Sequence, residues 1–373
     1  MDSLNERESG AQPEILLRRV GFDAEGWIVS DLPHNRWLTP GIWHLQRGDE
    51  RLVMKWLSAS KPKGINPFEA HWSANSLTPT RWNYWAREAL AYQSGLLERR
   101  FGGTDGFELP QVIAIDVTAT DAVVLLSFVD GIGAEHWSID DYGDAARALG
   151  AVHARSTAAS EPWLSSGFIG DYSSEKPVDW SLLDSDDAWA QPIIAECFPP
   201  NLRALAVEVH HRRVELLAVV CRTERAVCHL DFWTKNLIRR ADGRTALIDF
   251  AFVGDGALGE DIGNLIPDAA FDHFVPAGLL PELETIVIDG YLDGLSHGGW
   301  NGDPEAIRRS TWAAGVKYDW LTPLLLERAS QGTHHRYGGT EPIDAAFMFK
   351  ERGQALEFCL GRALRSLDTL PGR

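Results

Sequence analysis

The stretch that decides the fold is Cys228-His-Leu-Asp-Phe-Trp-Thr-Lys-Asn-Leu237, followed after a polar turn by Leu247-Ile-Asp-Phe-Ala251. Its notable polar residues are Asp231, Asn236 and Asp249. Each of them flanks or ends an apolar run that reads as a short buried strand. We therefore expect all of them at the mouth of a β-hairpin, where their polar groups can face a ligand.

These residue types suit one chemistry in particular. Phosphoryl transfer needs a carboxylate that orients the attacking hydroxyl, together with oxygen ligands for Mg²⁺. Asp231, Asn236 and Asp249 would supply that set, and the H-x-D-x-x-x-x-N spacing is the one that kinase catalytic loops use. Alone, the motif could be a cap or a turn. The hydrophobic strand ending in Asp249-Phe250 favours the functional interpretation.

Together with the residues that follow it, this motif resembles the aminoglycoside phosphotransferase and choline kinase-like family, the small-molecule relatives of protein kinases. The resemblance covers most of the chain and is most specific at residues 228–265. It rests on His229-Leu-Asp231 with Asn236, on Ile248-Asp-Phe250, and on Gly256 with Gly259-Glu-Asp261.

The resemblance implies a role for each motif residue. Asp231 would be the catalytic residue, and Asn236 and Asp249 would hold magnesium. ATP, or another nucleoside triphosphate, would be the phosphoryl donor. His229 would be structural and would orient the catalytic loop.

The first part of the chain can be compared with the same family. A kinase needs a strand lysine on the phosphates, fixed by a glutamate from a helix. We expect Lys55, in the strand-like run Arg51–Leu57, and Glu88, in a helix over Arg81–Phe101, to form this pair. The run that ends in Ser127-Phe-Val129 resembles the hinge whose backbone would hold the adenine edge, so Ser127, Phe128 and Val129 are expected to contact the nucleotide.

The expected fold is α+β, a protein-kinase-like arrangement of two lobes. Residues 1–129 would form a small β-rich lobe that binds the nucleotide, and residues 130–373 a larger helical lobe. The helical lobe would contain the catalytic loop, the magnesium site and the acceptor site. Its first helix would be capped by Asp140 or Asp141. A hairpin would join Ala226–Asp231 to Thr245–Val253.

The sequence departs from the family at two places. Leu230 precedes the catalytic aspartate, where aminoglycoside kinases commonly have Gly and protein kinases Arg. The segment His34–Trp43, expected to cover the nucleotide, is not rich in glycine. There is also no A-P-E segment, so we do not expect control by phosphorylation of an activation loop.

A glycine motif after this region resembles the one in dinucleotide-binding proteins, but the sequence around it does not fit such a site. Gly254-Asp-Gly-Ala-Leu-Gly259 is a literal G-x-G-x-x-G, as in dinucleotide-binding turns. No βαβ unit follows it, and its acidic residues would lie near a pyrophosphate. We interpret these glycines as loop residues, and Asp261 as a group that stabilises the segment or caps the next helix. The sequence also lacks the P-loop motif G-x-x-x-x-G-K-[ST].

Composition limits the classes of partner. The chain has 373 residues and a formal net charge of −18, which argues against nucleic acid as a partner. It shows no signal peptide and no apolar run long enough to cross a bilayer, so we expect no membrane partner and a cytoplasmic location. Its four cysteines form no C-x-x-C pair, which indicates reduced thiols.

The acceptor is expected to be a small molecule with a hydroxyl group. An acidic, tryptophan-containing segment from Asp179 to Trp189 would suit a cation, so an aminoglycoside, amino sugar or aminocyclitol is the first expectation. A solvated acidic loop explains the segment equally well. A neutral sugar, a choline-like alcohol or a macrolide would need no different catalytic residues. The candidate acceptor-binding residues are Asp184, Asp187, Glu260, Asp268, Tyr318 and Asp319.

The leading hypothesis is an ATP- and Mg²⁺-dependent kinase for small molecules. A non-catalytic binding protein built on the kinase fold is a second hypothesis. It would be favoured by the loss of Lys55, Asp231 or Asn236, all of which are present. A protein kinase is a third, and the missing activation-segment features argue against it.

Overall fold

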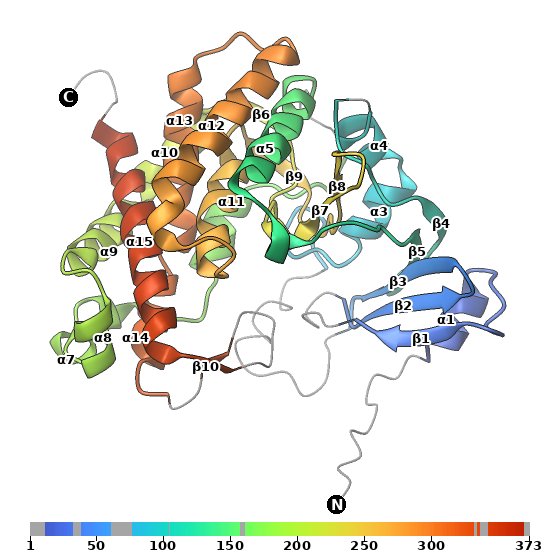
Figure 1. Cartoon of the computed structure of the whole chain (residues 1–373), viewed down its shortest axis with the longest axis horizontal. Helices are drawn as coiled ribbons and strands as arrows, with labels where there is room; N and C mark the ends of the chain where they lie inside the picture. The colour runs from blue at the N-terminus through green and yellow to red at the C-terminus, as the bar shows by residue number, and fades with distance from the viewer. Residues whose placement is uncertain are drawn as a thin grey trace, which may run out of the picture.

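The computed structural model describes residues 12–32, 39–60, 77–103, 105–156, 161–331, 334–335 and 342–368. A β-sheet formed by the first part of the chain adjoins a larger, mainly helical part (Figure 1). Residues 34–38, half of the expected nucleotide-covering segment His34–Trp43, lie outside the described residues.

The N-terminal sheet is antiparallel and has the strand order β1-β2-β3-β5-β4. Alternation of buried and half-exposed residues along β2 gives the sheet two different faces. One face packs on helix α1 (Pro13–Arg19) through Leu17, Trp43 and Met54. The strands are β1 (Ile28–Asp31), β2 (Gly41–Arg47), β3 (Glu50–Ser58), β4 (Val112–Val117) and β5 (Asp121–Ser127).

The opposite face of the sheet packs on two short helices, α3 (Arg87–Gln93) and α4 (Leu96–Phe101). The expectation of one helix over Arg81–Phe101 is wrong. Residues 81–86 form turns, and Gly95, with a φ of 67°, separates the two helices. The fully buried guanidinium of Arg87 donates to backbone carbonyl oxygens, including those of Trp82, Trp163 and Ala251. It thereby ties the start of α3 to the helical part.

Four short strands surround the catalytic-loop sequence: β6 (Arg225–Cys228), β7 (Leu237–Arg239), β8 (Thr245–Leu247) and β9 (Gly254–Ala257). The hairpin pairs β7 with β8, whereas β6 pairs with β9. The expected pairing of β6 with β8 is therefore wrong. So is the interpretation of residues 254–257 as a loop. A Cβ atom on Gly254 would lie 2.4 Å from the carbonyl oxygen of Ser165, so this strand position requires glycine.

The helical part begins with α5 (Ile139–Ala154). Its N-cap is Ser138, not Asp140 or Asp141 as expected; the carboxylate of Asp141 completes a capping box. The other helices are α6 (Phe168–Ser174), α7 (Asp186–Trp189), α8 (Pro192–Cys197), α9 (Leu202–His211), α10 (Arg213–Arg222), α11 (Glu260–Phe271), α12 (Leu280–His297), α13 (Pro304–Ala313), α14 (Leu321–Arg328) and α15 (Ala345–Asp368).

Helices α5 and α12 lie side by side (Figure 1) and touch backbone to backbone. Glycines make this approach possible. A Cβ on Gly150 of α5 would lie 2.2 Å from the carbonyl oxygen of Tyr291, and one on Gly294 of α12 would lie 2.0 Å from that of Arg147. The two helices therefore form a close-packed pair behind the catalytic loop.

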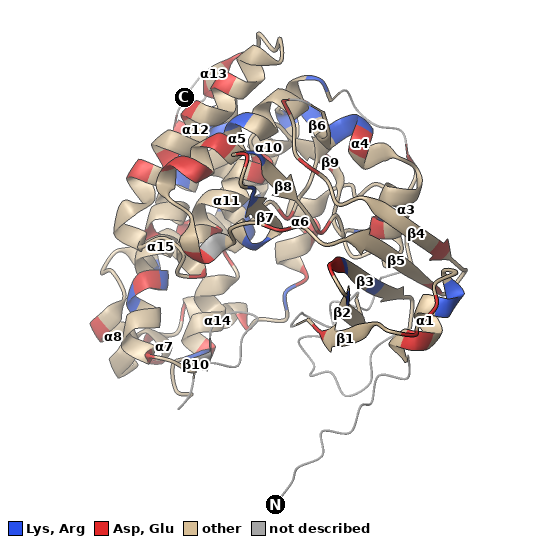
Figure 2. Cartoon of the chain, turned by 45° about the vertical axis from the view of Figure 1, so that its right-hand side comes forward, with Lys and Arg blue, Asp and Glu red and all other residues tan. Residues whose placement is uncertain are grey.

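Charge is distributed over both parts of the molecule. In Figure 2 the Asp and Glu positions are interspersed with Lys and Arg in both the sheet and the helices. No helix among the described residues combines the length and the apolar character needed to span a membrane.

Candidate active site

The sheet and the catalytic loop meet at a buried lysine. Lys55 on β3 contacts both oxygens of Glu88 on α3, at 2.8 and 3.0 Å, and Oδ1 of Asp249 at 3.4 Å. Burial disfavours the charge of Lys55, but the charges of Asp249 and Glu88 outweigh this effect, so its pKa lies above the ordinary value. The structure thus brings together three of the residues that the sequence selected, with Lys55 cationic between two acids.

Asp249 follows β8 and has a φ of 63°, which is uncommon outside glycine. Ile248, the residue before Asp249, donates its N–H to the carbonyl oxygen of Asn236 at 3.0 Å. This hydrogen bond fixes the backbone of Asn236 relative to that of Asp249, and these are the two candidate metal ligands. The Asp249 side chain is 37% exposed, which leaves its carboxylate accessible. Such carboxylate and amide oxygens are ligands that Mg²⁺ accepts.

The catalytic loop holds Asp231 beside Asn236. The Nδ2 atom of Asn236 donates to Oδ2 of Asp231 at 3.1 Å and to the Asp231 carbonyl oxygen at 2.9 Å. Because Nδ2 makes both bonds, the amide oxygen Oδ1 is the atom left to act as a metal ligand. The residues present therefore fit a divalent cation.

His229 orients this loop. Its Nε2 lies 3.0 Å from the carbonyl oxygen of Ile248, and its Nδ1 accepts the N–H of Asp231 at 3.3 Å. Burial lowers the pKa of His229 to about 4, so the ring is neutral and carries its proton on Nε2. It therefore joins the loop to the strand before Asp249, a positioning role.

Leu230 has a φ of 64°, in the left-handed region that favours glycine. The carboxylate of Asp261 accepts the N–H groups of His229 and Leu230 at 2.8 and 2.7 Å and fixes this conformation. Asp261 lies in the first turn of α11, so it anchors the catalytic loop from a helix end. In this chain the position is occupied by leucine, and the Leu230 side chain is buried.

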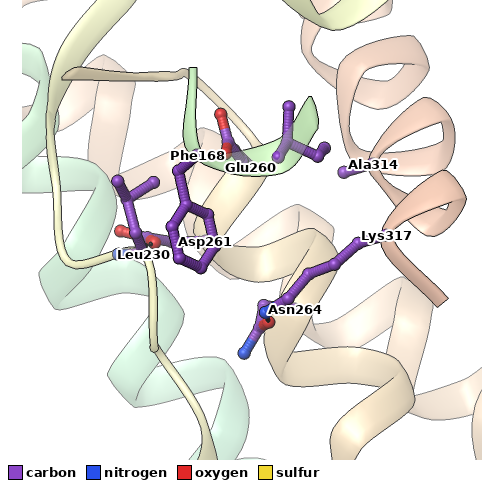
Figure 3. Close-up of a pocket in the computed structure, with 8 residues that line it drawn as sticks. Phe168, Leu230, Glu260, Asp261, Asn264, Ala314 and Lys317 are labelled. Carbon is purple, nitrogen blue, oxygen red and sulfur yellow. Dashed lines mark hydrogen bonds between the residues drawn. The ribbon is translucent and has the colours of Figure 1, made fainter. Parts of the chain in front are cut away.

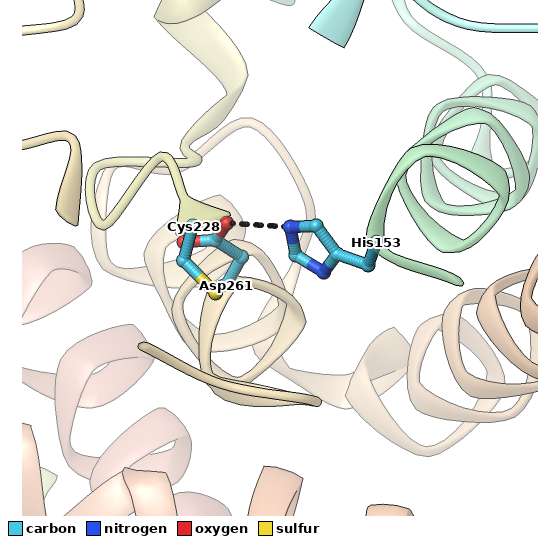
Figure 4. Close-up of side chains that lie close together, drawn as sticks. All are labelled: His153, Cys228 and Asp261. Atoms are coloured by element: carbon cyan, nitrogen blue, oxygen red, sulfur yellow. Dashed lines mark ion pairs between the residues drawn. The ribbon is translucent and has the colours of Figure 1, made fainter. Parts of the chain in front are cut away.

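Behind the loop, His153, Cys228 and Asp261 form a fully buried cluster whose ligating atoms lie within 4.8 Å of one another (Figure 4). His153 Nε2 is 3.5 Å from Asp261, and its Nδ1 is 2.8 Å from the hydroxyl of Tyr291 on α12. Burial lowers the pKa of His153 to about 3, so it is neutral. Because both Asp261 oxygens already accept backbone N–H groups, we interpret the cluster as support for the loop.

Burial raises the pKa of Asp231 to about 7. The nearby carboxylates Asp249 and Asp268 act in the same direction, whereas Lys317 and the hydrogen bond from Asn236 act in the opposite one. A carboxylate with a pKa near neutrality suits a group that accepts a hydroxyl proton.

On the other side of Asp231, a cluster of polar side chains links the helix α11 to the 3₁₀ helix that contains Lys317. Lys317, in the 3₁₀ helix η5 (Ala314–Tyr318), donates to Oδ1 of Asn264 on α11 (Figure 3). Asn264 donates to Asp268 at 2.8 Å, and the Tyr318 hydroxyl donates to Asn264 at 3.0 Å. A cavity of about 10 Å³ beside them, large enough for one water molecule, is lined by residues that include Leu230 and Glu260.

Of the expected acceptor residues, Asp268 and Tyr318 lie in this group, and Glu260 lines the cavity. The sequence did not single out Asn264 or Lys317. The available signal was Lys317 itself, a lysine within the apolar segment Ala313–Tyr318.

The remaining expected acceptor residues lie elsewhere. The buried Asp319 forms an ion pair with the half-buried Arg213 at 2.6 Å. Asp184 and Asp187 are exposed, next to and within α7, which both whole-chain views place away from the β7–β8 hairpin (Figures 1 and 2). The structure does not bring these three residues to Asp231, and their assignment stays a prediction.

The expected hinge follows β5. The Ser127 N–H is bonded to the Gln111 carbonyl oxygen at 2.8 Å, and the Phe128 N–H to that of Arg51 at 3.1 Å. Within the part of the chain that the structure describes, the Val129 N–H has no such partner. Val129 is therefore the hinge residue with a backbone donor available for a ligand.

Comparisons with known proteins bear on this geometry. The family model described as the phosphotransferase enzyme family matches residues 96–300. The chain belongs to this family. The matched region contains the catalytic loop, Asp249 and Asp261, whereas Lys55 and Glu88 precede it. A comparison with curated protein sequences finds no significant match.

Solved structures show the fold. The chain is similar to amicoumacin kinase hAmiN in complex with AMP-PNP, Ca²⁺ and Ami, with 11% identity, a TM-score of 0.51, and coverage of 93% of this chain and 94% of that one. It also matches choline kinase LicA from Streptococcus pneumoniae (13% identity, TM-score 0.47, coverage 96% and 99%). The expected protein-kinase-like fold of the phosphotransferase enzyme family, with a β-rich part and a larger helical part, is confirmed.

Proposed function

We propose that the chain transfers the γ-phosphoryl group of ATP, or of another nucleoside triphosphate, to a hydroxyl group of a small molecule. The observation that carries the proposal is the geometry at Asp231. This carboxylate is held by Asn236, has a pKa near neutrality, and lies on the loop joined through Ile248 to Asp249 and its Lys55–Glu88 pair. Membership of the phosphotransferase enzyme family supports the same chemistry.

Each residue has a role in this proposal. Asp231 orients the acceptor hydroxyl and takes its proton as the acceptor oxygen bonds to the γ-phosphorus, while the bond from that phosphorus to the bridging oxygen breaks and the nucleoside diphosphate leaves. Lys55 binds the phosphates of the donor, and Glu88 holds Lys55 in place. Asn236 and Asp249 would hold Mg²⁺, which when bound neutralises charge on the phosphates. Asp261 and His229 are positioning residues that fix the loop.

The nucleotide base would lie at the hinge, between Ser127, Phe128 and Val129. The Val129 N–H would donate to the base. The Phe128 N–H already donates to the carbonyl oxygen of Arg51, so Phe128 would make van der Waals contact with the base and would not donate its backbone N–H to it.

Turnover with a panel of acceptors tests the proposal. The purified protein with ATP and Mg²⁺ would be incubated with aminoglycosides, amino sugars, neutral sugars, sugar acids, choline and macrolides, and ADP release and product mass followed. We expect one acceptor class to gain one phosphate, with activity lost in Asp231→Asn and retained in Lys350→Met, a control on the exposed surface of α15. If AMP-PNP with Mg²⁺ neither binds nor raises the melting temperature, the proposal is wrong and a non-catalytic protein is favoured.

A further inference from the structure

A fully buried arginine lies directly before Glu88 in the chain. Arg87 is the first residue of α3, and all five N–H groups of its guanidinium donate hydrogen bonds. The acceptors are the backbone carbonyl oxygens of Pro79, Arg81, Trp82, Trp163 and Ala251. Among the described residues no carboxylate is paired with this cation, whereas a buried charge ordinarily has such a partner. Arg87 therefore binds segments of backbone and not another charged side chain.

The carbonyl groups belong to three separate stretches of the chain. Residues 79–82 lie in the turns before α3, Trp163 precedes α6, and Ala251 lies two residues after Asp249. The guanidinium nitrogens lie 2.9 Å from the Trp163 oxygen and 3.1 Å from the Ala251 oxygen. Because one planar, rigid group makes all these bonds, the start of α3 and the backbone after Asp249 are fixed relative to each other.

Two other residues of α3 contact the same segment. The rings of Tyr92 and Phe250 lie 6.0 Å apart, nearly at right angles. Burial raises the pKa of the Glu88 carboxyl, while Lys55 and the backbone of Phe250 stabilise its charged form. Phe250 and Ala251 are thus both held from α3, immediately after the candidate metal ligand.

Arginine is the side chain that can make this set of bonds. Burial lowers the pKa of Arg87 to about 9, so the group is still cationic at neutral pH. Its five donors form a fixed fork in one plane, whereas lysine has three donors on a single nitrogen. A lysine at this position would keep the charge but would leave carbonyl oxygens of the surrounding segments without a donor.

We propose that Arg87 is a positioning residue of the donor site, which holds the backbone after Asp249 against α3 and thereby sets the place of the Asp249 carboxylate relative to Lys55. The inference rests on the proposed function, in which Asp249 would hold Mg²⁺. Arg87 would not touch the nucleotide itself, because all its N–H groups are already used. It acts through the metal ligand, as residues that orient such ligands do.

Calorimetric titration with AMP-PNP, once with excess Mg²⁺ and once with EDTA, tests the inference without relying on turnover. We expect Mg²⁺ to tighten binding to the wild type. In Arg87→Lys, AMP-PNP with Mg²⁺ should bind roughly 10- to 100-fold more weakly than in the wild type, and the difference in EDTA should be smaller. Arg87→Met should show at least the same loss. Arg87→Lys carries the test if the methionine variant does not fold.

Two further variants separate positioning from stability. Arg362 on α15 forms an ion pair with Glu284 on α12 at 2.9 Å and so joins two helices of the helical part. Arg362→Met should lower the melting temperature and leave AMP-PNP affinity unchanged. In an Asp249→Ala background, Arg87→Lys should weaken binding little further, because the ligand that it positions is absent.

The outcomes distinguish this inference from the proposed function. If AMP-PNP with Mg²⁺ binds the folded Arg87→Lys variant as tightly as the wild type, the inference is wrong and the proposed function stands. The same holds if the loss is equally large in EDTA, or if it adds in full to that of Asp249→Ala. If the wild type binds no AMP-PNP, both proposals fail. A cooperative melting transition above the titration temperature shows that a variant is folded.

Discussion

The two sides of Asp231 are built differently. On the donor side, Lys55, Glu88 and Asp249 form one contact group with distances of 2.8 to 3.4 Å, and the sequence selected all three. On the proposed acceptor side, Asn264 and Lys317 come from separate helical segments. The sequence selected neither of them, although it selected Asp268 and Tyr318 of the same group. A fixed reaction keeps its groups at recognisable spacings, whereas recognition of an acceptor draws on whichever residues the fold brings close.

The largest effect is expected from substitution of Asp231, which lies between the two sides. Asp231→Asn should lower kcat by about 10²- to 10⁴-fold, because the variant cannot accept the hydroxyl proton. The measurement is steady-state ADP release with the identified acceptor. AMP-PNP should still raise the melting temperature, since the donor side is intact; a variant that keeps full activity would remove Asp231 from the mechanism.

A loss on the donor side should affect stability as well as activity. Lys55→Met leaves Glu88 buried without its cation, which costs about 3–5 kcal/mol of the free energy of unfolding. Urea denaturation measures this loss, and AMP-PNP binding should weaken. Lys350→Met on the surface of α15 is the control. Unchanged stability in Lys55→Met would mean that Glu88 is protonated in the folded state.

Weakening the hydrogen bonds by which Asp261 supports the catalytic loop should have a smaller effect than the two substitutions above. In Asp261→Asn an amide N–H₂ group replaces one of the oxygens that accept the N–H groups of His229 and Leu230, and one N–H is left unsatisfied. We expect a loss of about 1–3 kcal/mol in the free energy of unfolding and a lower kcat with little change in KM for ATP. A change confined to KM would contradict the positioning role.

The pH dependence links the two sides. Burial raises the pKa of Asp231 from its ordinary 3.8 to about 7, so kcat/KM should rise with pH and level off above about 7. Lys317 lowers this pKa, so Lys317→Met should move the inflection to higher pH, while Lys350→Met should not. An inflection that stays in place would show that Lys317 does not act on Asp231.

The same pKa has a consequence for stability with a definite sign. Between pH 3.8 and 7 the folded protein holds a proton on Asp231 that the unfolded chain has lost. The contribution of this group to stability therefore falls as pH rises through that range. The buried Asp261, Asp268 and Asp272, whose pKa values are also raised, contribute with the same sign. Asp231→Asn should therefore make the slope smaller without removing it, which melting temperatures measured across the range would detect.

The smallest effect is expected far from the loop. Asp184→Asn and Asp187→Asn change exposed side chains beside α7 and should alter neither the melting temperature nor kcat/KM appreciably. A marked rise in KM for the acceptor would restore the acidic segment as part of the acceptor site and weaken the contrast between the two sides.

The sequence could predict what depends on local spacing. The spacing of the catalytic loop is a local motif, and the lysine–glutamate pair and the hinge strand were expected from the family resemblance that this motif supports, so the fold class was accessible. The pairing of β6 with β9 was not, because Gly254 and Gly256 look like loop residues until the close approach of Ser165 and Cys228 is known. Asn264 and Lys317 were missed because no pattern in the chain brings them together.

The close contact between α5 and α12 has a consequence for how the molecule opens. These helices carry His153 and Tyr291, whose side chains meet behind the catalytic loop, and their glycines leave no space for water between the backbones. Amide protons in the centre of both helices should therefore exchange with solvent only through global unfolding, later than those of the edge strand β1. The last part of the molecule to loosen would then be the part that holds the catalytic loop.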